Sequence, residues 1–528
     1  MNVAKVVLRN VAASWVGLVS QVVVTFFLTP FVIRELGTEA YGVWLLLQGL
    51  VGYYGMVDMG LRAGLTQSIT RRIAADDVVS VRRHIAAAIP LLSGLAAVIM
   101  LAATVLAIVL PSFVEMSGEL AASIWTVVLI QAFGAAIKMP VTPYGSVLVG
   151  LQRYDIANAV TIFTRIIFAV VTWLALSRGG GLIALSIVLM STNCLDGLIR
   201  VVVARRCLPG IRGCGITLDR TEIREITSVG IWNFLIGISR QFIYFSDTIV
   251  VAILFSARAV APYGIAASLV DYGTKIVIAS TKVLFPTMAY LSKQENKESL
   301  TMLYVTATRL VIGLSLSILI VGSVWIRPFL ALWLGDSADA NYLTSEAPLI
   351  FAVLSLAFLF VGFQRAGIQL LLAENKLKLV ATLMFLEAII NLVGSIIFGN
   401  LIGPVGIAIG TLIAASTMGL LFHVPAHAKI LHQQCLWLIF QISFRPMIFG
   451  CILAASIYGL ANLIGQPMTW SQLMLAGGTS GTIVCILAPV LLTAGQISDL
   501  RRTLQKRCDS IRKRFKRSSN VSDAAQSH

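Results

Sequence analysis

Residues 232–255, WNFLIGISRQFIYFSDTIVVAILF, have the length and apolar character of a helix that crosses a lipid bilayer, yet they include Arg240 and Asp247. A window of about 20 apolar residues is enough to span the hydrocarbon core, because an α-helix rises about 1.5 Å per residue and satisfies its own backbone hydrogen bonds. Similar windows recur along the chain from 10–33 to 471–494, and we identify about fourteen of them. The sequence therefore predicts an all-α polytopic membrane protein with about fourteen transmembrane helices.

The composition supports this prediction. Of the 528 residues, 58% are hydrophobic and 12% are charged, whereas an ordinary soluble domain carries about a quarter charged residues. The seven cysteines have no C-x-x-C spacing, so no disulfide framework or zinc site is predicted. His423 and His427 have the i, i+4 spacing of metal ligands, but no third ligand is near them in sequence, so we interpret them and His432 as interfacial histidines. No phosphate-binding loop for ATP is present, and no metal or cofactor is expected.

Basic residues are distributed unevenly between the two sides of the predicted membrane. They gather in the loops 61–83 and 205–225 and in the C-terminal segment 500–517. By the positive-inside rule this side is cytoplasmic, and both termini lie there. The net charge of +16 follows this topology, so no nucleic-acid partner is expected. The basic tail either lies as a helix on the anionic inner leaflet or stays solvated. The opposite side has few basic residues, namely Arg34, Arg178, Arg258 and Arg327.

A weak internal repeat divides the predicted helices into two groups of six. GLIALSIVLMST at 181–192 aligns without gaps on GIAIGTLIAAST at 406–417, and two further short matches share nearly the same offset. An even number of helices in each copy gives the two copies the same orientation, so they should form two pseudo-symmetric lobes. We expect an N-terminal six-helix lobe with a cytoplasmic linker, a C-terminal six-helix lobe, two additional helices and a basic cytoplasmic tail, at 1–227, 228–430, 431–498 and 499–528.

Basic side chains within the predicted helices are candidates for binding a substrate. Exposing seven of them to lipid would cost roughly 20 kcal/mol, so they must reach water, a partner or a ligand. Five are close enough to the cytoplasmic ends to snorkel there, whereas two lie nearer the middle of the bilayer. The five are Lys138, Arg165, Lys282, Arg309 and Arg365, and the two are Arg240 and Lys275.

Acidic side chains in the helices are candidate counter-charges or sites for a coupling ion, H⁺ or Na⁺. Asp271 and Lys275 have the i, i+4 spacing that pairs two side chains on one helix face. Asp247 follows Arg240 by seven residues, about 10 Å along the helix axis, which is too far for a simple contact. These four charges could form a neutral network with a purely structural role. The remaining bases outnumber the remaining acids, chiefly Asp58, Asp196 and Glu387, so we predict a positive cavity suited to a phosphate or pyrophosphate head group.

Residues 26–72, FFLTPFVIRELGTEAYGVWLLLQGLVGYYGMVDMGLRAGLTQSITRR, resemble the polysaccharide-transport family that includes O-antigen and exopolysaccharide flippases. This family belongs to the multidrug/oligosaccharidyl-lipid/polysaccharide (MOP) exporter superfamily. The resemblance rests on Pro30, the short turn LGTEAYG, the segment YGMVDMGL and the basic residues that follow, together with GLQRYDIAN at 150–158.

The resemblance implies two lobes in a V shape around a cationic cavity. It also implies a flippase in the bacterial inner membrane that moves an undecaprenyl-pyrophosphate-linked oligosaccharide to the outer leaflet, for lipopolysaccharide or exopolysaccharide, driven by an ion gradient. Membrane lipids, a glycan polymerase and glycosyltransferases would be its partners. No family residue maps onto a single short motif here, so the site residues come from the charge argument alone.

Three alternatives remain open. A lipid II flippase shares the architecture and the cationic cavity, and an ion-coupled antiporter of cationic drugs would have an acidic cavity instead. A membrane glycan polymerase or ligase needs a large external catalytic loop, but the largest predicted external connection spans roughly 20 residues. We therefore predict a transporter and not an enzyme.

Overall fold

The computed structural model describes residues 3–228, 231–496 and 498, and these residues are almost entirely helical. Twelve helices in this part of the chain are long and apolar enough to cross a membrane. The described residues contain no β-strand. The predicted all-α polytopic fold is therefore confirmed. The basic tail at 499–528 lies outside the described residues.

Helix α1 (Val3–Ala74) contains the first two predicted spans, which are separated by a sharp change of direction at Gly37. Gly37 has φ 81° and ψ 166°, a backbone conformation that a residue without a Cβ adopts at little cost. The first part of α1 runs to this point and the second part runs back. Two predicted helices are thus joined by a single glycine.

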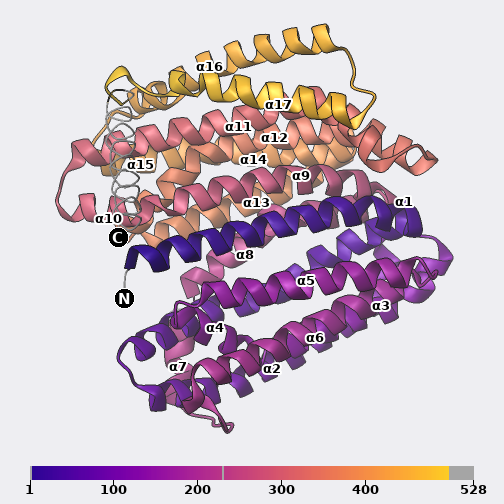
Figure 1. Ribbon diagram of the computed structural model, residues 1–528, viewed down its shortest axis with the longest axis vertical. Coiled ribbons are helices and arrows are strands. Elements are labelled where there is room, and N and C mark those ends of the chain that lie inside the picture. Colours follow the sequence, from indigo (N-terminus) through magenta and orange to yellow (C-terminus); the bar gives the residue numbers. More distant parts are fainter. Residues whose placement is uncertain (1–2, 229–230, 497, 499–528) are drawn as a thin grey trace, which may run out of the picture.

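The N-terminal lobe consists of α1 and the five helices that follow it, shown from indigo to magenta in Figure 1. The helical stretch from Gly118 to Gly150 is divided into α3 and α4 at Met139–Val141, where Pro140 interrupts the helix. After α6, the short helix η1 (Pro209–Ile211) and α7 (Arg220–Ser228) lead to the second lobe. The five helices are α2 (Val78–Phe113), α3 (Gly118–Lys138), α4 (Thr142–Gly150), α5 (Tyr154–Leu176) and α6 (Gly181–Cys207).

The C-terminal lobe follows α7, and two further helices pack on its outer side against α11 (Figure 1). The two further helices are α16 (Cys435–Ile464) and α17 (Trp470–Leu487), followed by η3 (Ala488–Leu491). The elements of the lobe are α8 (Ile231–Leu254), α9 (Ala257–Lys282), α10 (Leu284–Lys293), α11 (Lys297–Leu334), α12 (Ala338–Ala373), α13 (Leu377–Ile402), α14 (Pro404–Thr417), the π-helix η2 (Met418–His423) and α15 (Val424–Leu431).

The two lobes meet at one end of the bundle. We call the end with the basic loops, at Arg71, Arg212 and Lys297, the basic face, and the end with Gly37 and Asp339 the opposite face. One buried apolar core joins both lobes toward the opposite face and includes Val32, Leu46, Ile124, Val251, Val260 and Ile350.

Toward the basic face the apolar cores of the two lobes are separate. One contains Leu65 and Val147 of the N-terminal lobe, and the other contains Leu300 and Ala428 of the C-terminal lobe. Polar contacts join the lobes at the opposite face as well: the backbone N–H of Thr38 donates to Asp339 Oδ2 at 3.3 Å. In the part of the chain that the structure describes, the two lobes are therefore in contact at the opposite face.

Candidate substrate-binding cavity

A cavity of about 510 Å³ lies within the C-terminal lobe, between α8, α9, α12, α13 and α14. Leu45 and Gln48 of α1 contribute to its wall, so the N-terminal lobe also borders it. Of the candidate residues predicted from the sequence, the cavity brings together three bases and three acids. They are Arg240, Lys275, Arg365, Asp247, Asp271 and Glu387.

Two guanidinium groups lie near each other in this cavity. Arg365 of α12 donates a hydrogen bond to the hydroxyl of Tyr244, and the charges of Arg240 and Arg365 interact. Arg240 and Tyr244 are four residues apart on α8 and therefore share a helix face. Neither arginine forms an ion pair with a carboxylate in the described part of the chain. This part of the cavity therefore has a concentration of positive charge that an anion would neutralise.

The predicted pair on α9 is confirmed. Lys275 Nζ lies 2.8 Å from Asp271 Oδ2, and the ammonium group is also 5.4 Å from the centre of the Tyr272 ring. The side chain of Lys275 is 34% exposed, so the ion pair does not remove it from solvent. An anion in the cavity can therefore reach the Lys275 ammonium group and replace Asp271 as its partner.

Asp247 is buried and bonded to hydroxyl groups. It accepts hydrogen bonds from Tyr263 Oη and Thr411 Oγ1, both at 2.7 Å, and from Ser395 Oγ at 3.0 Å. Asn391 Nδ2 donates to Thr411 Oγ1 at 2.9 Å. No base pairs with Asp247 among the described residues, so it is not joined to Arg240 in an ion pair. A buried carboxylate surrounded by oxygen atoms has the chemistry of a site for a hard cation or a proton.

Glu387 of α13 is also buried, and it accepts a hydrogen bond from Gln364 Nε2 at 3.1 Å. Arg365 is near enough for its charge to act on Glu387. Glu387 therefore partly offsets the positive charge of Arg365, although the two side chains do not form an ion pair in the described part of the chain.

Three other candidate residues lie outside this cavity. Arg165 Nη1 donates to the backbone carbonyl of Gly17 at 2.9 Å, which joins α5 to α1. Arg309 Nε donates to the carbonyl of Gln441 at 2.8 Å, which joins α11 to α16. Lys282 is the last residue of α9 and is exposed. The side chain of Asp58 lies outside the described part of the structure.

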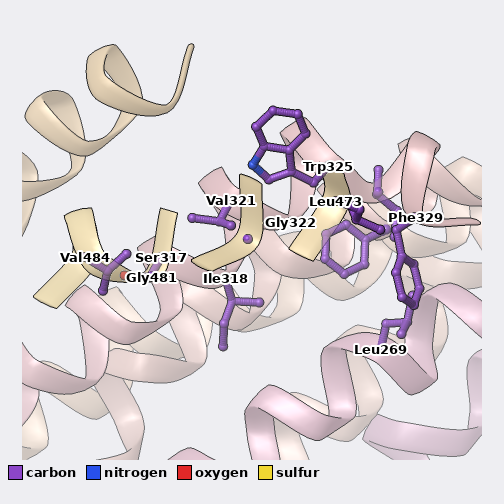
Figure 2. Close-up of a pocket in the computed structure, with 13 residues that line it drawn as sticks. Leu269, Ser317, Ile318, Val321, Gly322, Trp325, Phe329, Leu473, Gly481 and Val484 are labelled. Carbon is purple, nitrogen blue, oxygen red and sulfur yellow. The ribbon is translucent and has the colours of Figure 1, made fainter. Parts of the chain in front are cut away.

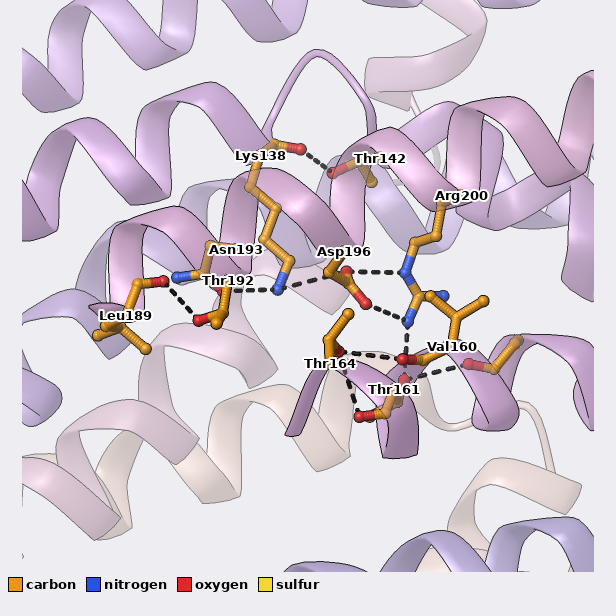
Figure 3. A network of polar contacts seen from close by, with 11 residues as sticks. Lys138, Thr142, Val160, Thr161, Thr164, Leu189, Thr192, Asn193, Asp196 and Arg200 are labelled. Atoms are coloured by element: carbon orange, nitrogen blue, oxygen red, sulfur yellow. Dashed lines mark hydrogen bonds and ion pairs between the residues drawn. The ribbon is translucent and has the colours of Figure 1, made fainter. Parts of the chain in front are cut away.

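Lys138 belongs to a polar network in the N-terminal lobe (Figure 3). Its Nζ lies 3.3 Å from Asn193 Oδ1 and 3.8 Å from Asp196 Oδ2. Arg200 binds both oxygens of Asp196 at 2.8 and 3.0 Å, and also donates to Thr161. Two bases thus share one carboxylate, which leaves a net positive charge. Arg200 is not among the residues predicted from the sequence, although its i, i+4 spacing from Asp196 indicates an ion pair on one helix face.

An apolar cavity of about 520 Å³ lies between α9, α11, α12 and α17. Figure 2 shows Trp325 and Phe329 of α11 beside Leu473 of α17, with Leu269 of α9 at the far end. Aliphatic and aromatic side chains of this kind suit a hydrocarbon chain.

Comparison with known proteins agrees with this architecture. Residues 7–292, more than half of the chain, match the family described as "Polysaccharide biosynthesis protein". No curated protein matches the chain. The chain therefore belongs to this polysaccharide biosynthesis family, as the resemblance in the sequence indicated.

Two solved structures show what the fold is similar to. The lipid II flippase MurJ, in an inward closed conformation, superposes with a TM-score of 0.66 at 12% identity, over 92% of this chain and 98% of MurJ. The inward-facing conformation of a multidrug resistance MATE transporter of the MOP superfamily superposes with a TM-score of 0.65 at 15% identity, over 77% of this chain and 94% of the MATE chain. The fold of this chain is thus similar to that of these two proteins.

A third structure in this group comes from Pyrococcus furiosus. It is a MOP superfamily transporter whose description says that the "reverse polarity of binding pocket suggests different function". Its TM-score is 0.60 at 16% identity, over 81% of this chain and 97% of that one. Within one fold, the polarity of the cavity thus differs between proteins.

Proposed function

We propose that this protein is a flippase that moves an anionic lipid-linked oligosaccharide, on undecaprenyl pyrophosphate, from the inner to the outer leaflet of the bacterial inner membrane for surface polysaccharide biosynthesis. The observation that carries the proposal is the neighbouring pair Arg240 and Arg365 in an interior cavity. Neither forms an ion pair with a carboxylate of the residues that the structure describes. Membership of the polysaccharide biosynthesis family supports it.

The positive charge around Arg240 and Arg365 fits a pyrophosphate. Two nearby guanidinium groups repel each other in a region of low dielectric constant, and an anion with several oxygens relieves this repulsion. Charge-assisted hydrogen bonds from arginine and lysine offset the loss of water around the phosphates. Lys275 adds a third donor on the neighbouring helix. The apolar cavity beside α17 is suited to the isoprenoid part of such a substrate.

The arrangement of the lobes supports alternating access. They share a core at the opposite face and have separate cores at the basic face. With the basic face in the cytoplasm, as its charge favours, this is a state that receives substrate from the inner leaflet. Separation of the lobes at the opposite face would then release the substrate outward.

Asp247 is the proposed site of a coupling cation. Its carboxylate and the oxygens of Ser395 and Thr411 offer a set of hard ligands close to the substrate cavity. Binding of a cation there neutralises a buried charge, so ion occupancy can bias the lobes between two states.

Replacing the cavity bases one at a time tests the proposal. We expect Arg240→Ala, Arg365→Ala and Lys275→Ala each to reduce surface glycan at least about tenfold, while the labelled lipid-linked precursor accumulates in the inner leaflet. Arg178→Ala, at an exposed turn, is the matched control and should export normally. Normal export by all three cavity variants at normal protein levels would overturn the proposal. Accumulation of lipid II instead would identify peptidoglycan precursor as the substrate.

A further inference from the structure

Two histidines are buried without enough hydrogen-bond partners in the C-terminal lobe. His423 ends the π-helix η2 and His427 lies one turn later in α15, and neither has any exposed surface. Within the described part of the chain, both ring nitrogens of His423 and Nε2 of His427 have no hydrogen-bond partner. Buried polar atoms are almost always paired, so three unpaired ring nitrogens in one place call for an explanation. A π-helix is also rare and is often found at functional sites.

The pair lies between the substrate cavity and the basic face. On the cavity side, His423 is near enough to Arg365 for their charges to interact, and Arg365 in turn interacts with Glu387. On the other side, His427 Nδ1 lies 3.1 Å from Tyr304 Oη, and the two rings are 5.4 Å apart. The rings of His423 and His427 are 5.8 Å apart. The four side chains, Arg365, His423, His427 and Tyr304, thus lie one after another from α12 to α11.

The series ends near the membrane surface. Tyr304 interacts electrostatically with Cys435, the first residue of α16, which follows the exposed residues 432–434 at the basic face. The ring of His427 lies directly over Gly367 of α12, where any Cβ would come within 1.8 Å of the ring. Close packing on one side therefore holds His427 in line with Tyr304.

We propose that His423, His427 and Tyr304 form a proton pathway that connects the cavity at Glu387 with the basic face. A neutral imidazole has one N–H and one lone pair, so it can accept a proton at one nitrogen and release one from the other. When Nε2 of His427 gains a proton from His423, an N–H bond forms there and the Nδ1–H bond breaks toward the hydroxyl oxygen of Tyr304. The proton of that hydroxyl leaves to water beside Cys435. The other ring nitrogen of His423 takes up a proton from the cavity at Glu387, so the net charge of His423, His427 and Tyr304 is unchanged.

This pathway adds a function to the flippase and does not depend on its substrate. The titratable groups beside the pair are Arg365, which interacts with His423, and Tyr304, which contacts His427. Arg365 interacts in turn with Glu387, and Tyr304 with Cys435. Arg365 also belongs to the proposed substrate site. An anion bound there would lower the cost of a positive charge on His423, so the occupancy of the cavity can regulate proton movement.

Proton flux into vesicles tests the pathway without any lipid-linked oligosaccharide. The purified full chain would be placed in phosphatidylethanolamine and phosphatidylglycerol vesicles with a trapped pH-sensitive dye, a pH gradient and valinomycin. We expect flux above that of protein-free vesicles, and we expect His423→Gln, His427→Gln and Tyr304→Phe to lower it at least about tenfold. Glutamine keeps a polar side chain in the site, and gel filtration checks that each variant is folded.

His432→Gln is the matched control, because His432 is exposed just outside the series, and its flux should equal that of the unmodified protein. Unmodified flux in folded His423→Gln and His427→Gln would overturn the proposal, as would an unmodified protein with no flux. A stoichiometric transition metal in the purified protein that both variants lose would also overturn it, in favour of a metal site. Because no substrate is present, these outcomes are independent of whether the cavity binds an oligosaccharide.

Discussion

Trp333 of α11 donates a hydrogen bond from its indole nitrogen to the backbone carbonyl of Phe26 in α1 at 2.8 Å, and this contact joins the two lobes. The rings of the same residues stack at 5.8 Å, and Trp470 of α17 meets Phe26 edge-on at 5.9 Å. The last transmembrane helix thus contacts the first through an aromatic cluster. Closure of the lobes at the opposite face therefore depends on α17 as well as on the helices of the two lobes.

Removing the indole N–H should favour separation of the lobes. Trp333→Phe keeps an aromatic ring but loses a hydrogen bond worth about 1 kcal/mol, so the open population should rise about fivefold. Spin labels at Arg34 and Asp336, exposed positions on the two lobes near this contact, would measure the distance in a cysteine-free background. Trp437→Phe changes an exposed tryptophan of α16 and should leave the distance distribution unchanged. An unchanged distribution in Trp333→Phe would show that this contact does not hold the lobes together.

Asp247 should be required for ion-dependent transport. Asp247→Asn keeps the shape of the side chain but removes its charge, so a bound cation would lose its only anionic ligand. We expect transport at saturating substrate to fall at least about tenfold and its dependence on Na⁺ or H⁺ to disappear. Measuring transport against each ion gradient separately identifies the ion. The matched control is Asp271→Asn, because Asp271 is partly exposed and paired with Lys275, and it should keep the ion dependence.

Sequence patterns predicted the membrane fold well because each transmembrane helix is recognisable from its own apolar residues. The pair Asp271 and Lys275 could also be predicted from the sequence, since both residues lie on one helix face. The partners of Asp247 could not be predicted in this way, because Ser395 and Thr411 lie 148 and 164 residues away in the sequence. Helix packing alone brings these hydroxyls to the carboxylate.

Basic residues in helices were harder to interpret from sequence. Arg165 and Arg309 satisfy their charge with backbone carbonyls of neighbouring helices, and a sequence does not show which carbonyl is within reach. Charge within a predicted span therefore marks a residue that needs a polar partner, and the fold decides whether this partner is protein or substrate.

The docking of α7 on the N-terminal lobe should weaken in acid. A hydrogen bond from Ser68 Oγ, 2.7 Å long, and the nearby charge of Arg72 hold the pKa of Glu225 below its usual value. A carboxyl with a lowered pKa stabilises the folded state above its ordinary pKa, and this contribution is lost as the pH falls through the folded value. Protection of α7 amides from hydrogen exchange should therefore decrease between pH 7 and about pH 4.

Glu225→Gln tests this interpretation of α7, because glutamine has no titratable group. Its α7 should already be less protected at neutral pH, and its protection should depend less on pH than that of the unmodified protein. His84 and Glu222 lie in the same cluster, 2.7 Å apart, and contribute any remaining dependence. If the pH dependence of Glu225→Gln equalled that of the unmodified protein, Glu225 would not be the responsible group.

A methyl group at Gly42 should separate the lobes where they pack most closely. A Cβ on this residue of α1 would come within 1.8 Å of the backbone oxygen of Ala257, at the start of α9, and a backbone carbonyl cannot move aside as a side chain can. We expect Gly42→Ala to destabilise the closed state by about 1–3 kcal/mol, the usual cost of overpacking, and to lower the melting temperature in detergent. Gly94→Ala is the matched control, because no atom lies within 4 Å of its added methyl and alanine favours the helix. A melting temperature of Gly42→Ala at or above that of Gly94→Ala would mean that the lobes can shift apart at this contact without cost.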